Sequence, residues 1–176
     1  MIGRVRGFTL IEILIVVAII GILAAILLPN AITAIQKAKQ KNTMKDIMTL
    51  ATAASDFISD NSEWGMSQSG DLVVGSAFVQ ALTPFYVKFC PINDLWGEPF
   101  KVYIGDDAAI RSIDPIDVDK NDFVIESYGR DSLSDGWTYD PQTPNDDYYV
   151  VDSLQAFKND LINWNGYWIR APRISF

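Results

Sequence analysis

The chain has 176 residues, of which 49% are hydrophobic and 12% aromatic, so it can supply one medium-sized core and a separate apolar segment. Its formal net charge is -8, and most acidic residues lie after residue 90, which argues against nucleic acid as a partner of that part. It has no histidine and one cysteine, Cys90, which excludes an intramolecular disulfide, the usual zinc sites and histidine-assisted nucleophilic catalysis. We therefore expect a protein that is not an enzyme.

The first predicted element is an apolar helix over residues 8–28. At about 1.5 Å per residue this helix spans roughly 30 Å, the thickness of the hydrocarbon core of a bilayer. Arg4 and Arg6 precede it without any acidic residue, which favours a single-pass orientation with the N-terminus in the cytoplasm and the rest of the chain outside.

Two simpler interpretations of this segment fit it poorly. A secretory signal peptide would have a polar region after its small-residue cleavage site, but Ala24 and Ala25 lie inside the apolar run. A plain membrane anchor leaves Glu12 unexplained, because a charge at the centre of a spanning helix costs about 2.5 to 3.5 kcal/mol. Glu12 therefore predicts a partner for its carboxylate.

The segment GFTLIE, from Gly7 to Glu12, resembles the processing motif of type IV pilins and of the pseudopilins of type II secretion. The short basic leader before it and Pro29 after it fit the same family. The resemblance implies that a prepilin peptidase removes residues 1–7 by cutting after Gly7 and that the new terminal amine, on Phe8, becomes methylated.

In this family the mature chains form a homo-oligomeric filament through the apolar helix. The Phe8 amine would add positive charge to the start of that helix, and Glu12 of a neighbouring subunit could neutralise it. An unpaired buried charge is costly, so such a pair disfavours every axial register of neighbouring helices that leaves the amine or the carboxylate alone. The pair would therefore set how the subunits pack. The resemblance also implies an inner-membrane assembly platform and minor pseudopilins as partners.

Residues 29–60 continue the helix in amphipathic form, with apolar side chains at helical spacing at Met44, Ile47, Met48, Ala51, Ala54 and Ile58. Pro29 removes a backbone hydrogen bond, so we expect a bend or local melting there. The lysines between Lys37 and Lys45 are either a solvated face or a contact for anionic lipid headgroups.

The rest of the chain, residues 61–176, predicts a globular head. A loop over 61–75 is followed by a short helix over 76–82, by strand-like sequence within 85–105, and by a strand over 123–129. We expect an α+β, ladle-shaped pilin fold in which the long helix packs on a small antiparallel sheet. The tail predicts a short helix after Asp152 or Ser153, and its aromatic residues predict either cover for the sheet edge or an interface: Trp164, Tyr167 and Trp168.

The segment DLWGEPF, residues 94–100, predicts a turn between strands. Gly97 is free to take a positive φ, Pro99 fixes the exit from the turn, and Trp96 can pack over the core. The segment also resembles the DPWGNPY signature of the major type II secretion pseudopilin, with Leu95 and Phe100 as departures from it.

The acidic loop over residues 127–147 suggests calcium, which takes six to eight oxygen ligands. An EF-hand is excluded, because Leu133 occupies its third position and Gln142 its last, where a bidentate Glu belongs. The loop resembles the calcium loop of the major pseudopilin, which implies ligands at the Tyr128 carbonyl, Asp131, Asp146 and Asp147. Asp135 or Asp140 could replace one of them, and the alternative is an acidic solvated loop without metal.

Three functions remain open from the sequence. The first is the major pseudopilin of type II secretion, a structural subunit in the export of folded proteins across the outer membrane. The second is a type IV pilin of a surface fibre for adhesion, twitching motility or DNA uptake. The third is a membrane-anchored binding module or enzyme, which would require the processing motif to be a coincidence.

Overall fold

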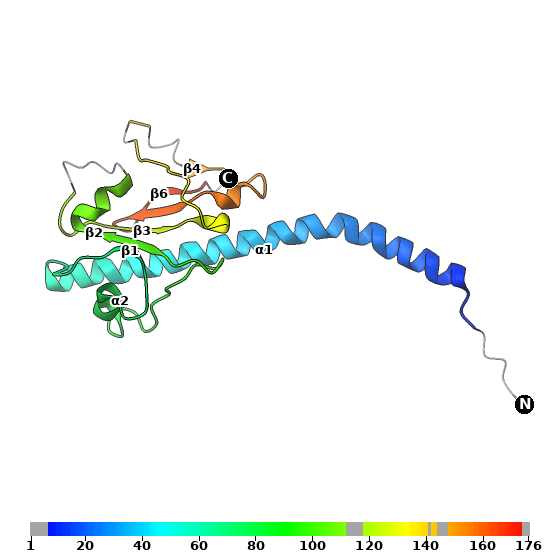
Figure 1. The fold of residues 1–176 in the computed structure, drawn as a ribbon, viewed down its shortest axis with the longest axis horizontal. Coiled ribbons are helices and arrows are strands. Elements are labelled where there is room, and N and C mark those ends of the chain that lie inside the picture. Colours follow the sequence, from blue (N-terminus) through cyan, green and yellow to red (C-terminus); the bar gives the residue numbers. More distant parts are fainter. Residues whose placement is uncertain (1–6, 112–117, 141, 144–147, 174–176) are drawn as a thin grey trace, which may run out of the picture. The chain divides into compact units, whose positions relative to one another are not determined.

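The computed structural model describes residues 7–111, 118–140, 142–143 and 148–173. The chain divides into two compact units, Met1–Gln36 and Lys37–Phe176. Helix α1 (Leu10–Asn61) is continuous and contributes residues to both (Figure 1). Within the described residues it is the one helix long and apolar enough to cross a membrane, which agrees with the predicted extent of the helix.

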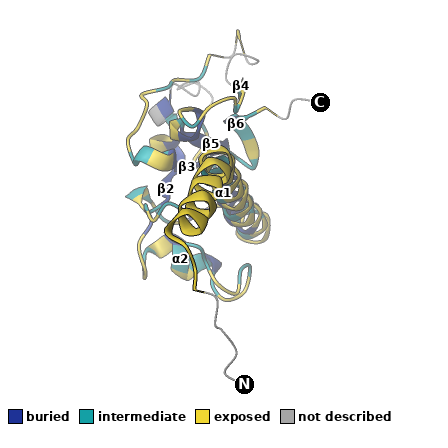
Figure 2. Ribbon diagram, turned by 90° about the vertical axis from the view of Figure 1, so that its right-hand side faces the viewer, coloured by how far each residue is buried: buried dark blue, intermediate teal, exposed yellow. Residues whose placement is uncertain are grey.

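The first unit consists of the start of α1, and its large apolar side chains are exposed from Phe8 to Ile35 (Figure 2). Such a surface needs lipid or neighbouring helices to cover it. Pro29 lies inside the helix without interrupting it. The Thr33 hydroxyl donates to the Pro29 carbonyl at 3.0 Å, and the Asn30 amide donates to the Ile26 carbonyl at 3.5 Å. Local melting is therefore absent there, and the bend stays a prediction.

The head contains a six-stranded sheet in the order β1-β2-β3-β5-β6-β4. The strands are β1 (Ser69–Asp71), β2 (Lys101–Ile104), β3 (Phe123–Ser127), β4 (Tyr148–Tyr149), β5 (Leu161–Trp164) and β6 (Tyr167–Pro172). Neighbouring strands are antiparallel except β4 and β6, which are parallel. The α+β class is thus confirmed, while the sheet is mixed and larger than predicted.

The head half of α1 lies between the sheet on one side and helix α2 (Ala77–Leu82) on the other (Figure 1). Its buried positions include Leu50, Ala51, Ala53 and Ala54, which are at most 2% exposed. Alanine side chains are small, so the sheet and α2 can both approach the backbone of α1 closely. This half of α1 is therefore buried on more than one side. The first core layer packs on it and contains, among others, Phe78, Leu82, Phe100, Val102, Phe123, Ile125 and Leu161.

A second core layer covers the opposite face of the sheet. Tyr103, Val124, Ile162 and Ile169 lie on that face, and aromatic side chains pack over them: Trp137, Tyr139 and Trp164. All five residues of β3 are consequently buried. Burial on both faces explains why β3 reads as a run of mostly apolar residues.

The short elements after α1 were predicted with mixed success. Helix α2 is confirmed, and the Ser76 hydroxyl caps it by accepting from the Val79 amide at 3.4 Å. The predicted loop over 61–75 contains strand β1. Of the strand-like sequence over 85–105, only β2 is a strand, preceded by an isolated bridge between Asn93 and Pro99.

The prediction for the tail was wrong. A 3₁₀ turn, η3 (Ala156–Lys158), takes the place of the predicted helix, and residues after it enter the sheet as β5 and β6. The signal was present, because Asn165 and Gly166 have φ of 49° and 86° and form the turn between these strands. Asn-Gly between β-formers is a strong hairpin signal. The tail therefore builds the sheet and does not merely cover its edge.

We predict that Gly129→Ala lowers the free energy of unfolding by at least about 3 kcal/mol. Gly129 begins the 3₁₀ turn η2 (Gly129–Asp131) with φ +67°, and a Cβ there would lie 2.8 to 2.9 Å from three carbonyl oxygens: those of Phe157, Lys158 and Asn159. Gly136 has the same φ with nothing within 4 Å of its added Cβ. Gly136→Ala should therefore cost only about 1 kcal/mol. Thermal or urea unfolding of the full chain in detergent measures both, and equal losses would contradict the steric argument.

Candidate functional site

The start of α1 brings together two of the residues of the processing motif. The Thr9 amide and the Thr9 hydroxyl each donate to Glu12 Oε2 at 2.8 Å, and the Glu12 amide donates back to Thr9 Oγ1 at 3.3 Å. This reciprocal arrangement is a capping box, which satisfies backbone groups that the first turn of a helix leaves unpaired. Sequence reasoning missed the role of Thr9, although Thr-x-x-Glu before an apolar run is the pattern of this cap.

Gly7 and Phe8 precede the cap, and Phe8 is 81% exposed. The carboxylate of Glu12 thus has a partner within its own chain, which the sequence interpretation did not foresee. That partner does not exclude a second one, because a carboxylate accepts several hydrogen bonds. Pairing of Glu12 with the Phe8 amine of a neighbouring subunit stays a prediction.

The DLWGEPF turn depends on Asp94, a residue whose role sequence reasoning also missed. Asp94 Oδ1 accepts from the amides of Trp96, Gly97 and Glu98 at 2.9, 2.9 and 3.0 Å. Its other oxygen accepts from the hydroxyl of Ser127, at the end of β3, at 2.7 Å. The predicted positive φ of Gly97 is confirmed at 102°, and Trp96 packs against the core. Asp94 therefore fastens this turn to the sheet.

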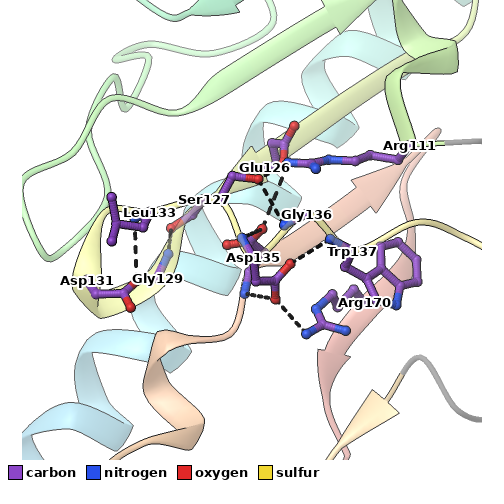
Figure 3. Close-up of polar contacts among 12 residues, drawn as sticks. Arg111, Glu126, Ser127, Gly129, Asp131, Leu133, Asp135, Gly136, Trp137 and Arg170 are labelled. Carbon is purple, nitrogen blue, oxygen red and sulfur yellow. Dashed lines mark hydrogen bonds and ion pairs between the residues drawn. The ribbon is translucent and has the colours of Figure 1, made fainter.

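A buried charge cluster ties η1 (Gly105–Arg111) to the sheet (Figure 3). Arg111 Nη2 donates to Glu126 Oε2 at 2.6 Å and to the Ser134 hydroxyl at 3.0 Å. The side chains of Arg111 and Glu126 are 9% and 0% exposed. Burial raises the pKa of Glu126, and the Arg111 guanidinium opposes that rise.

The same cluster holds the acidic loop against β6. Arg170 Nη2 donates to Asp135 Oδ2 at 2.6 Å, and the Trp137 amide donates to the other oxygen at 3.0 Å (Figure 3). The Arg170 guanidinium also lies 5.4 Å from the centre of the Trp137 ring. The Asp135 amide donates to Asp160 Oδ2 at 3.1 Å, and Asp160 is fully buried. Arginines of the chain itself therefore fix this part of the loop.

The carboxyl groups of Asp135 and Asp160 shift each other's pKa. The pKa of Asp160 is raised to about 8, chiefly by burial and then by its hydrogen bond to Asp135 and by the charges of Asp135 and Glu126. The pKa of Asp135 is lowered because its hydrogen bonds to Asp160 and the Trp137 amide, together with Arg170, outweigh the effect of burial. At neutral pH the proton therefore resides on Asp160.

The predicted calcium ligands are only partly within the described residues, because Asp146 and Asp147 lie outside them. Asp131 follows Tyr128 in the η2 turn, and Lys158 Nζ lies 3.9 Å from Asp131 Oδ2. Asp135 already pairs with Arg170. Asp140 accepts from Gln142 and Thr143 in a local turn. The described part of the chain brings no three acidic side chains together as a metal site, so calcium binding stays a prediction.

Comparison with known proteins supports the resemblance seen in the processing motif. The family model for the prokaryotic N-terminal methylation motif matches residues 2–28. The type II secretion system core protein G of Dickeya chrysanthemi is 27% identical over 162 residues, covering 92% of this chain and 88% of the relative. The protein of the same name from Klebsiella pneumoniae is 36% identical over 107 residues, covering 56% of this chain and 74% of the relative.

A relative of a second kind matches a shorter stretch. The type IV major pilin protein PilA of Myxococcus xanthus is 49% identical over 61 residues, or 35% of this chain and 28% of the relative. No solved structure matches this chain. The motif and the apolar helix together fit a protein anchored in the inner membrane.

We predict that the folded protein loses stability as pH rises from about 4 to about 8. Asp160, with a folded pKa of about 8, keeps a proton that the unfolded chain releases near its ordinary, lower pKa. Between about pH 4 and about pH 8 the folded state therefore binds more protons than the unfolded state, and the free energy of unfolding falls as the pH rises. In Asp160→Asn the side chain stays neutral, so its melting temperature should fall less than that of the wild type.

Asp152→Asn, at an exposed aspartate, is the matched control and should follow the wild type. Calorimetry of the full chain in detergent at several pH values measures the three curves. Parallel curves for wild type and Asp160→Asn would contradict the buried proton.

Proposed function

This chain belongs to the family of type II secretion system core protein G, and we propose that it is the structural subunit of a pilus-like filament that acts in the export of folded proteins across the outer membrane. The supporting observation is the similarity to core protein G, which extends over most of the chain and thus includes the head. A structural subunit of a filament needs no catalytic group.

The N-terminal unit supports this function physically. Its exposed apolar side chains suit lipid before assembly and neighbouring α1 helices after it. The proposal includes cleavage after Gly7 by a prepilin peptidase and methylation of the Phe8 amine, as the N-terminal methylation motif implies. It places the N-terminus in the cytoplasm and the head in the periplasm, with an inner-membrane assembly platform and minor pseudopilins as partners.

Glu12 has two separable tasks in this proposal. Within one chain the Glu12 side chain completes the capping box by accepting hydrogen bonds from Thr9. A glutamine side chain can accept the same hydrogen bonds without the negative charge. Between chains Glu12 neutralises the Phe8 amine of a neighbour, and that task requires the negative charge. Breaking a buried ion pair by removing one partner costs about 3 to 5 kcal/mol, so the second task would dominate assembly.

A type IV pilin is the second candidate, since PilA is 49% identical over 61 residues. That match covers 35% of this chain and 28% of the relative, whereas the similarity to the Dickeya chrysanthemi protein covers 92% and 88%. The core protein G relatives match the chain beyond the helix, and we favour the secretion filament for that reason.

We predict that Glu12→Gln and Glu12→Leu remain in the membrane but form filaments at least about a hundredfold less well, because the Phe8 amine loses its counter-charge. Thr9→Val removes the hydroxyl of the cap and keeps the charge, so it should cost only about 1 kcal/mol and leave filaments largely intact. Filaments sheared from cells and quantified by immunoblot, with membrane fractions as reference, measure the three variants.

The comparison between Glu12→Gln and Thr9→Val decides between the two tasks. If Thr9→Val assembles as poorly as Glu12→Gln, capping explains the requirement and the pairing between subunits is wrong. If Glu12→Gln assembles normally, the negative charge has no part in assembly.

Calcium binding by the acidic loop is a further part of the proposal, with Asp131 and the Tyr128 carbonyl as ligands and with Asp146 and Asp147 completing the site. Adding a chelator should lower the melting temperature of the full chain in detergent, and Asp131→Asn should remove that response. Asp140→Asn is the control, because its carboxylate serves a local turn. An unchanged melting temperature, together with no calcium in elemental analysis, would retire the metal.

A further inference from the structure

A groove of about 630 Å³ runs beside the head half of α1. Its apolar lining comes from α1 and from the segments around β4 and β6, and includes Met44, Met48, Val150, Trp168 and Pro172. Four cations also line it: Lys37, Lys41, Lys45 and Arg173. We call this surface the basic groove, and all of it lies in the unit Lys37–Phe176.

Within the described residues the cations of the basic groove have little counter-charge, since Asp46 acts on Lys45 through its charge without forming a salt bridge. Their side chains form no ion pair with any part of the chain that the structure describes, and all four residues are exposed. This positive surface belongs to a chain of net charge -8. An occupant with both carboxylates and apolar side chains would match the cations and the lining together.

The chain itself carries such a surface near the end of α1. Phe85 and Phe89 are 81% and 79% exposed. The Phe85 ring packs edge-on against the Tyr86 ring, with the ring centres 4.9 Å apart. The Tyr86 hydroxyl donates to Asp60 at 3.0 Å, and Asp56 also acts on Tyr86 through its charge. We call Phe85, Phe89, Asp56 and Asp60 the aromatic-acidic tip. Lys88 Nζ lies 5.6 Å from the centre of the Phe89 ring, so the tip and its surroundings carry two carboxylates and one cation.

The groove and the tip are far apart along one helix. Lys41 and Asp60 are separated on α1 by about 28 Å at 1.5 Å per residue. Two-fold pairing of the groove with the tip would need antiparallel copies, whereas subunits anchored in one membrane run parallel, so in the filament the two surfaces cannot pair across a two-fold axis. They form a heterologous contact, which repeats from copy to copy and generates an open helical filament when it does not close into a ring.

We propose that the basic groove of one subunit receives the aromatic-acidic tip of a second copy of this chain. This contact rests on the proposed filament function and adds a contact between heads to the packing of the apolar helices. It covers two large exposed aromatic side chains and supplies carboxylates to cations that form no salt bridge within the described residues. Anionic lipid headgroups are the competing occupant, and the experiments below separate the two.

Cross-linking tests the contact in assembled filaments. The native cysteine is first removed as Cys90→Ser, and Lys41→Cys in the groove is combined with Lys88→Cys beside the tip. Each copy then carries one cysteine of each kind, so a short bis-maleimide should produce a ladder of dimers, trimers and longer chains on a denaturing gel. Either single-cysteine variant can give dimers at most.

Two controls test whether the ladder reports a specific contact between the groove and the tip in filaments. Tyr167→Cys replaces Lys88→Cys in the first, because Tyr167, the first residue of β6, is 76% exposed and belongs to neither surface. The second adds Glu12→Leu, which should abolish filaments and the ladder together. Normal filaments without a ladder, or an equal ladder with Tyr167→Cys, would overturn the docking contact and leave the filament function standing.

Charge exchange provides a second, independent test. Lys41→Glu with Lys45→Glu should lower filament yield about tenfold, because like charges then face each other across the contact. Asp56→Lys with Asp60→Lys should do the same, and all four substitutions in one chain should restore assembly. Circular dichroism and the melting temperature check that each variant folds.

Each outcome of the exchange has a definite meaning. Restored filaments in the fourfold variant support the contact between copies. Unchanged filaments in the lysine variants, or no restoration in the fourfold variant, overturn it. Reduced binding to vesicles of anionic phospholipid by the lysine variants, with filaments unaffected, would assign the groove to lipid.

Discussion

The structure depends on the burial of the head half of α1 between the sheet and α2. Small side chains at Ala51, Ala53 and Ala54 let both layers approach, and Leu50 fills the space between them. The same continuous helix begins as a segment whose large apolar side chains are left exposed by its own chain. One element therefore has two environments, a protein core at one end and a surface made for lipid or sister helices at the other.

The second organising feature is charge neutralisation inside the head. Glu126, Asp135 and Asp160 face Arg111 and Arg170, and the proton on Asp160 balances the remaining charge. Buried ion pairs contribute little net stability but are costly to break, so they select one arrangement of the chain. Here they select the position of the acidic loop, which in turn lays Trp137 and Tyr139 over the outer face of the sheet. Cys90 adds nothing reactive, because burial raises the pKa of its thiol to about 11.

The long helix, α2 and β3 were predictable because each has a signal within its own segment. These signals are the hydrophobic period of α1, the Ser76 cap of α2 and the β-forming residues of β3. The same holds for the processing motif and for the turn at Gly97. The tail and the charge cluster were missed for a different reason. Arg111, Glu126, Asp160 and Arg170 come from four separate segments, and no spacing rule links them. The β5–β6 hairpin did have a local signal in Asn165-Gly166, which was overlooked, but the position of β5 between β3 and β6 is set by tertiary packing.

The order of strands has a consequence for how the head is made. Strand β5, from residues 161–164, lies between β3 and β6, so an interior position of the sheet is filled by a segment that is synthesised late. Until it arrives, β3 has one open edge, and the two core layers lack Leu161 and Ile162. The sheet of the head therefore cannot be complete before residues 161–164 have been synthesised. A subunit that waits for its last strands in this way has little chance of joining its neighbours while half-folded.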